Sequence, residues 1–394
     1  GRGAPGALEI PIDLQYAAVE KVRVAALETP EFAPDEQVTA KIAERIRGTR
    51  RRVIVAGGGV IAGEGSAALM RLAEQLDAPV ITSVDGRGAI PEDDPRCIGN
   101  YYQSAGIYDA IADADLTLAV GTRFAVGVDG QGAKFKPPGE LLQIDIDANV
   151  IGRTHRASLG MVADAGLALD ALNTALAEGE LSANDGQFNE TVWEARDGVR
   201  AAMRKRLGPD FAAIMDSMRN KLPRDGLWLR DMTIAAYNFG NQLFPVYEPR
   251  TSMNPASGAI GPGLPLAVGA TAATGRKSVL IHGDGGFMLH ATELATLAQY
   301  QLPLVVCIFN DGGYGVLRWL QDTRFGRINE TDLGKVNFAE MAASMGVPGQ
   351  RVASVAEFEA ALNLGMASDG PYLIDIDMEH LKPMEISIMP KKQG

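Results

Sequence analysis

Cysteine, histidine and positive charge are scarce in this chain of 394 residues. Its only two cysteines, Cys97 and Cys307, lack the paired spacing of a zinc site. We interpret them as small buried side chains in a reducing compartment. The four histidines are scattered and form no His-x-x-x-His pair, which argues against metal binding through imidazole.

Two further absences exclude classes of protein. The formal net charge of −12 argues against general nucleic-acid binding, because a phosphate backbone requires a basic face. The longest apolar runs, such as residues 302–309, are far shorter than the ~20 residues that a membrane-spanning helix needs. The first residues do not have the pattern of a secretory signal. We therefore expect a cytoplasmic protein, and an apolar content of 46% is ordinary for globular domains.

Residues 35–181 are expected to form the first of two α/β domains. A helix should begin after Asp35, whose side chain can cap it, because Val38, Ile42 and Ile46 lie four apart on one face. Strands and helices then alternate, which is the pattern of a parallel sheet with helices on both faces. The expected strands lie at 52–60, 79–82, 116–121 and 141–146.

Residues 188–380 repeat this alternation after a helix around 191–207. The predicted fold class is therefore α/β, with two doubly wound parallel-sheet domains. The expected strands of the second domain lie at 227–229, 278–281, 304–309 and 372–376, and its helices include 263–274, 291–300 and 355–366.

The remaining segments are interpreted as connections. The polar residues 182–187 would link the two domains. Residues 1–34 would begin with one strand at 7–14, which has no preceding partner in the sequence, followed by a Pro-broken linker. Residues 381–394 would form a tail.

Two acidic residues follow expected strands of the second domain inside glycine-rich turns. Asp284 stands in Gly-Asp-Gly-Gly, and Asp311 stands in Asn-Asp-Gly-Gly-Tyr-Gly. The carboxyl ends of parallel strands are where α/β proteins bind ligands, and two converging carboxylates suit a hard cation such as Mg²⁺. Glycine turns also present backbone N–H groups, which suit a phosphate. The alternative is that both aspartates only end strands in ordinary turns, which explains neither their spacing nor the apolar run before each.

A second glycine-rich segment, residues 258–269, precedes the first acidic turn. Its glycines allow the backbone to approach a flat ligand closely, and Ile260 is the one bulky apolar side chain in the turn. The alternative is a helix entry with packing roles only. Its place just before the acidic turn favours the functional interpretation.

The first domain contains a weaker glycine pattern after its first strand. Gly57 and Gly59, with Gly63 or Gly65, loosely match a dinucleotide-binding loop, and Asp85 is a candidate contact for a ribose. FAD or ADP could therefore bind in this domain. The alternative is a tight strand-to-helix turn in a structural domain.

The two acidic turns together resemble the thiamine-diphosphate signature, and the whole chain resembles thiamine-diphosphate-dependent enzymes of the acetolactate synthase and benzoylformate decarboxylase type. Residues 85–95, 113–124 and 143–153 look most like acetolactate synthases. Residues 310–320 look closer to benzoylformate decarboxylase.

The resemblance implies roles for particular residues. The side chains of Asp284 and Asp311 and the carbonyl of Gly313 would hold Mg²⁺. The carbonyl of Gly258 would accept a hydrogen bond from the aminopyrimidine of thiamine diphosphate, and Ile260 would bend the cofactor. Backbone donors near the diphosphate would come from Gly285, Gly286, Tyr314 and Gly315, with Thr233 as a further contact.

Two departures from the family pattern affect these expectations. Many relatives carry Asn where this chain has Asp311. The family's N-terminal pyrimidine-binding domain, with its activating glutamate, has no counterpart in the sequence, and Glu9 does not match that position. The resemblance implies that residues 1–34 are the remnant of this preceding domain and a linker. We therefore expect no catalytic glutamate within these 394 residues, and weak cofactor binding and poor turnover from this chain alone.

The implied function is a thiamine-diphosphate- and Mg²⁺-dependent carboligase or decarboxylase acting on 2-keto acids. Acetolactate-synthase-like ligation comes first, and a benzoylformate-type decarboxylase or a 2-hydroxyacyl-CoA lyase is the alternative. Two other classes remain open: a non-catalytic nucleotide-binding relative, and a dehydrogenase that binds nicotinamide at residues 57–59. The family's active site spans two chains, which implies a homodimer or homotetramer.

Overall fold

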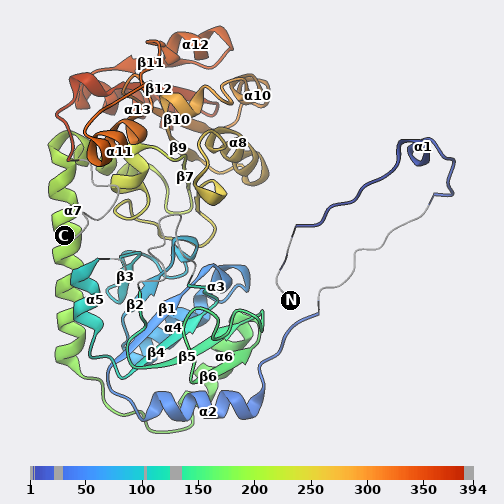
Figure 1. Cartoon of the computed structure of the whole chain (residues 1–394), viewed down its shortest axis with the longest axis vertical. Coiled ribbons are helices and arrows are strands. Elements are labelled where there is room, and N and C mark those ends of the chain that lie inside the picture. The colour runs from blue at the N-terminus through green and yellow to red at the C-terminus, as the bar shows by residue number, and fades with distance from the viewer. Residues whose placement is uncertain (1–2, 4, 22–29, 102–103, 125–134, 386–394) are drawn as a thin grey trace.

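The computed structural model describes residues 3, 5–21, 30–101, 104–124 and 135–385. Within them, two six-stranded sheets form two α/β domains, one above the other in Figure 1. Neighbouring strands run parallel in both sheets, and helices cover the sheet faces. The predicted fold class is confirmed.

The first sheet has the strand order β3-β2-β1-β4-β5-β6. Its strands are β1 (Arg52–Ala56), β2 (Val80–Thr82), β3 (Cys97–Gly99), β4 (Leu116–Val120), β5 (Glu140–Asp145) and β6 (Leu159–Val162). The helices of this domain are α2 (Glu36–Arg47), α3 (Gly58–Ala62), α4 (Ser66–Leu76), α5 (Ala105–Ile111) and α6 (Ala165–Ala177). As predicted, Asp35 caps α2, because its side chain accepts a hydrogen bond from the Val38 amide.

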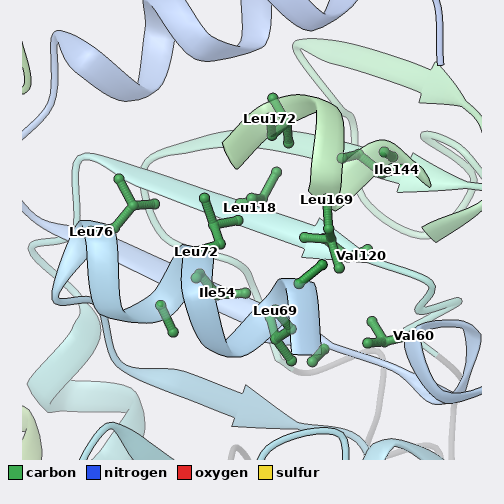
Figure 2. Packing of buried hydrophobic residues seen from close by; sticks show 14 of the residues in the cluster. Ile54, Val60, Leu69, Leu72, Leu76, Leu118, Val120, Ile144, Leu169 and Leu172 are labelled. Atoms are coloured by element: carbon green, nitrogen blue, oxygen red, sulfur yellow. The ribbon is translucent and has the colours of Figure 1, made fainter. Parts of the chain in front are cut away.

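One core cluster of the first domain lies between its sheet and helices α2, α4 and α6. Leu69 and Leu72 of α4 meet Leu169 of α6 over Ile54 and Leu118 of the central strands (Figure 2). These side chains are at most 1% exposed. The spacing of the α4 leucines along one helix face, visible in the sequence, is what directs this face to the sheet.

The second sheet has the strand order β11-β12-β10-β9-β7-β8. Its strands are β7 (Leu227–Arg230), β8 (Ser252–Met253), β9 (Ser278–Gly283), β10 (Leu304–Asn310), β11 (Gly349–Val352) and β12 (Tyr372–Asp377). The helices are α8 (Gly263–Thr274), α9 (Asp284–Phe287), α10 (Glu293–Tyr300), α11 (Gly315–Phe325), α12 (Phe338–Ser344) and α13 (Val355–Ala367). This order places β7, β9 and β10 side by side, and the candidate site lies at the ends of these three strands.

A long helix, α7 (Gly186–Lys221), runs along both domains in Figure 1. It breaks at Gly208, whose φ of 69° is left-handed, and resumes at Pro209. The predicted helix at 191–207 therefore corresponds to the part before the break. In the segment 182–187, expected as a linker, the Ser182 carbonyl accepts a hydrogen bond from Arg52 of the first domain, and α7 begins at Gly186.

A buried ion pair joins the two domains. Arg87 contacts Glu92 with 2.7 Å between Nε and Oε1, and Arg87 also donates to the carbonyl of Gly240 in the second domain at 2.9 Å. Glu92 in turn accepts a hydrogen bond from the Val246 amide. The first domain thus braces the end of the π-helical turn η3 (Ala236–Gly240) and the segment that follows it.

The expected strand at residues 7–14 is wrong. Residues Ile12–Gln15 form one helical turn, α1, with no buried residue, and the described residues around it are exposed. A strand requires a neighbour to satisfy its backbone N–H and carbonyl groups. Figure 1 shows this segment extending away from both sheets, so within the described residues it has no such neighbour.

The glycines after β1 serve packing. The Gly57 amide donates to the Val120 carbonyl and the Gly59 amide to the Gly121 carbonyl, both at 2.9 Å. A Cβ atom on Gly57 would lie 2.2 Å from the Gly121 oxygen. Because these two amides already have acceptors, they are not available to a phosphate, and this turn gives no support for FAD or ADP binding.

In the part of the chain that the structure describes, none of the helices combines the length and the apolar character needed to cross a membrane. Cys97 and Cys307 are both free and buried, as expected.

Candidate active site

Three neighbouring strands of the second sheet end at one cavity of about 540 Å³. Asp284 follows β9, Asp311 follows β10, and Thr233 follows β7. All ten residues predicted as cofactor or metal contacts line this cavity. They are Thr233, Gly258, Ile260, Asp284, Gly285, Gly286, Asp311, Gly313, Tyr314 and Gly315.

The two acidic side chains interact within the cavity. Asp284 is 5% exposed, and its Oδ2 accepts a hydrogen bond from the Gly313 amide at 2.8 Å. Burial, and then the neighbouring Asp311, raise the pKa of Asp284 to about 7. Burial also raises the pKa of Asp311, although Arg318 opposes this shift with its Nη1 atom 3.6 Å from Asp311 Oδ2. The cavity therefore holds a surplus of negative charge that a cation would neutralise.

The donor set fits a hard divalent cation. Among the described residues, no three His, Cys, Asp or Glu side chains gather where they could hold a metal ion. Two carboxyl groups and the nearby Gly313 backbone would leave the remaining positions to oxygens of a phosphate or water, which is the way Mg²⁺ is commonly bound. The residues present thus fit a Mg²⁺–diphosphate pair.

Two glycines of the acidic turns lie so close to neighbouring side chains that a larger residue would not fit at their positions. A Cβ atom on Gly315 would lie 1.9 Å from Asp311 Oδ2, and one on Gly285 would lie 2.7 Å from the Tyr314 ring. Gly315 begins α11 and Gly285 lies in the first turn of α9, where amide groups have no acceptor within the helix. The amides at these two helix starts suit a ligand with oxygens.

One predicted donor is corrected. The Tyr314 amide donates to the Thr331 carbonyl at 2.8 Å, and a neighbouring bridge joins Gly313 to Asp332. The Tyr314 amide is thus occupied by the chain itself, because this bridge holds the turn against residues 331–333. Tyr314 remains in the cavity lining.

Sequence reasoning missed two groups of residues. Apolar side chains form much of the wall, and they come from the turn after β7, from β10, from α11 and from the end of β12: Met232, Ile234, Tyr237, Phe309, Val316, Leu317, Leu320 and Met378. The second omission is Asp231, which follows β7 as Asp284 follows β9. The run Leu-Trp-Leu-Arg before Asp231 was the available signal.

Unfolding measurements should detect the interaction between the side chains of Asp284 and Asp311. A carboxyl group whose pKa is higher in the folded than in the unfolded chain favours folding at low pH, and this contribution is lost as the pH rises from about 4 towards the folded-state pKa of about 7. We expect Asp311→Asn, which removes the like charge, to weaken this loss. At pH 8 the variant should therefore be more stable than wild type.

The measurement is urea unfolding between pH 5 and pH 8 in the presence of a chelator. Asp332→Asn is the matched control, because Asp332 contacts the same Arg318 but its side chain is 83% exposed. Equal pH slopes for wild type and Asp311→Asn would contradict the coupling of Asp284 to Asp311.

Comparison with known proteins defines the class. Residues 39–172 match the central domain of thiamine pyrophosphate enzymes, and residues 234–376 match their C-terminal TPP binding domain. The chain belongs to the thiamine pyrophosphate (thiamine diphosphate) enzymes, which decides against the dehydrogenase hypothesis.

Individual relatives are similar over nearly the whole chain. The probable acetolactate synthase large subunit of Methanocaldococcus jannaschii is 32% identical, over 95% of this chain and 67% of the relative. The probable 2-ketoarginine decarboxylase AruI of Pseudomonas aeruginosa has the same identity and coverage. Acetolactate synthase 2 of Zea mays is 30% identical, over 98% of this chain and 64% of the relative. The chain thus spans about two thirds of the length of these relatives.

The fold also matches a solved structure. A Mycobacterium smegmatis protein assigned to the thiamin diphosphate-dependent enzymes superposes with a TM-score of 0.69 at 24% identity, over 90% of this chain and 66% of that one. At this identity the match supports the fold alone.

Proposed function

We propose that this chain provides the thiamine diphosphate- and Mg²⁺-binding part of an enzyme that acts on 2-keto acids, with acetolactate-synthase-like carboligation as the reaction. The observation that carries the proposal is the convergence of Asp284 and Asp311 in one glycine-lined cavity. Relatives named as acetolactate synthases support the choice of reaction.

Different residues of the cavity would contact different parts of the cofactor. Asp284, Asp311 and the Gly313 carbonyl would hold Mg²⁺, and amides of Gly285, Gly286 and Gly315 would face the diphosphate. Gly258 and Ile260 would contact the aminopyrimidine half. Thiamine diphosphate, when bound, supplies a nucleophilic carbon and an electron sink for cleaving and forming bonds next to a carbonyl.

The chain's own contribution beside the cofactor would be an apolar, water-poor wall. Ile234 and Tyr237, which follow β7, and Leu317 and Leu320 of α11 line the cavity. Such a wall would exclude water from the reacting carbonyl and strengthen electrostatic contacts inside the site. Water exclusion favours ligation to a second carbonyl compound, because a competing proton source is removed.

A calorimetric titration tests the cofactor assignment. We expect thiamine diphosphate to bind the chain saturably when Mg²⁺ is present and to bind at least about tenfold more weakly with a chelator, since the diphosphate would lose its bridging cation. Equal binding with and without Mg²⁺, or none in either condition, would show the proposal to be wrong.

Product analysis tests the reaction. With a 2-keto acid as substrate, carboligation yields a carbon–carbon coupled product, whereas a benzoylformate-type decarboxylase yields an aldehyde. The decarboxylase alternative is kept because a 2-ketoarginine decarboxylase is as similar to this chain as an acetolactate synthase is. We also propose a homodimer or homotetramer, which a solution mass measurement would check.

A further inference from the structure

A third carboxyl group, Asp231, lies beside the candidate site without lining its cavity. It follows β7 and is 0% exposed. Its Oδ2 atom accepts hydrogen bonds from the amides of Gly261 at 2.9 Å and Gly263 at 2.8 Å. Both amides belong to the segment that carries Gly258 and Ile260, so Asp231 touches the site through this segment.

The segment needs such an anchor. Gly258 has a φ of 69° and Gly261 a φ of 100°, values at which glycine has a freedom that other residues lack. A glycine-rich turn has many conformations to lose when it is ordered. Two hydrogen bonds to one buried carboxyl group limit the positions that the Gly258 carbonyl and the Ile260 side chain can take.

The residue before it anchors the other end of the segment. Arg230, 1% exposed, donates from Nη1 to Ser252 Oγ at 2.8 Å and from Nη2 to Asn254 Oδ1 at 3.0 Å. Successive side chains of a strand point to opposite faces. The end of β7 thus holds residues 252–254 with one side chain and residues 261–263 with the next, and the Gly258 turn lies between them.

Asp231 also borders the turn expected to face the diphosphate. A Cβ atom on Gly286 would lie 3.1 Å from Asp231 Oδ1. His282 Nε2 lies 3.4 Å from Asp231 Oδ2. The carboxyl group therefore lies between the two turns, but it hydrogen-bonds the amides of the Gly258–Gly263 turn.

We propose that Asp231 is a positioning residue that fixes the Gly258–Gly263 turn, and through it the aminopyrimidine half of thiamine diphosphate. The inference rests on the proposed function for the identity of the ligand. The anchoring of the turn itself rests only on the contacts above.

Hydrogen exchange tests the anchoring without any cofactor. In the full chain, Asp231→Ala should speed exchange in peptides covering residues 258–263 by about tenfold or more, because two protected amides lose their acceptor. Asp231→Asn, which keeps one acceptor oxygen, should lie between alanine and wild type. Unchanged exchange in both variants would overturn the inference, and if the alanine variant fails to fold, the asparagine variant decides.

Comparing the affinities of two ligands then distinguishes a positioning role of Asp231 from a general loss of stability. At a fixed, saturating Mg²⁺ concentration, Asp231→Asn should raise the Kd of thiamine diphosphate by about tenfold, the loss of roughly one hydrogen bond to a charged group. The Kd of inorganic pyrophosphate, which lacks the aminopyrimidine, should change by less than about twofold. Equal weakening of both ligands would overturn the positioning role.

Thr271→Val is the matched control. Thr271 is a buried residue of α8 that donates to Ser278 Oγ at 2.9 Å, away from the turn. This variant should lower the melting temperature but leave the exchange of residues 258–263 and the ratio of the two dissociation constants unchanged. If wild type binds pyrophosphate but not thiamine diphosphate, the proposed function fails, whereas the exchange result still decides the anchoring by Asp231.

Discussion

Replacing Asp284 with alanine is expected to raise the Kd of thiamine diphosphate, measured by calorimetry at a fixed Mg²⁺ concentration, by at least about a hundredfold. Removing a residue that only hydrogen-bonds to a metal ligand already lowers metal affinity by about 10–100-fold. Asp284 would itself be a ligand. The variant also removes the acceptor of the Gly313 amide, whose carbonyl is the third proposed ligand.

The fold should survive this change. Burial and Asp311 raise the pKa of Asp284 to about 7, so at pH 8 the free protein gains from losing this carboxylate. Asp322→Ala is the control, because Asp322 lies on α11 near the site but is exposed. Retained Mg²⁺-dependent binding in Asp284→Ala would exclude the proposed metal site.

The second large effect is expected from Gly315→Ala. The added methyl group would lie 1.9 Å from Asp311 Oδ2 and 2.5 Å from Ile234 Cδ1, so the Asp311 carboxyl group has to move. In an open helical position the same change stabilises a protein by about 0.5–1 kcal/mol. Here overpacking should destabilise it by about 1–3 kcal/mol, and the Kd of thiamine diphosphate should rise at least about tenfold.

Urea unfolding and the cofactor titration measure these two quantities. Gly334→Ala provides the control from a neighbouring loop, since a Cβ atom there meets nothing within 4 Å. We expect Gly334→Ala to change neither stability nor affinity noticeably. A stabilised Gly315→Ala with wild-type affinity would show that the turn adapts and that close packing of Asp311 is unimportant.

Elements with strong local signals were predicted well. The apolar runs before Asp284 and Asp311 became β9 and β10, and the expected helix at 263–274 coincides with α8. Buried strands bounded by glycine and helices with regular apolar spacing carry their signal in adjacent residues. The same is true of the glycine turns, because glycine readily adopts the positive φ values that such turns require.

Elements that depend on distant partners were not predicted. The strand β8 (Ser252–Met253) is too short to have a periodic pattern, and it exists because β7 pairs with it. The expected strand at 7–14 failed for the opposite reason, since no described neighbour pairs with it. The continuation of α7 after Gly208, as far as Lys221, was also not predicted.

The sequence by itself determined the fold class and the chemistry of the two acidic turns, because both depend on residue types within short segments. Only the tertiary structure decided that these turns meet, since their convergence requires the strand order β10-β9-β7, which brings together segments far apart in the chain. The same order brings Asp231 to the glycine turn that follows it and the apolar wall to the cavity. Contacts of this kind depend on packing across the sheet, and no local pattern encodes them.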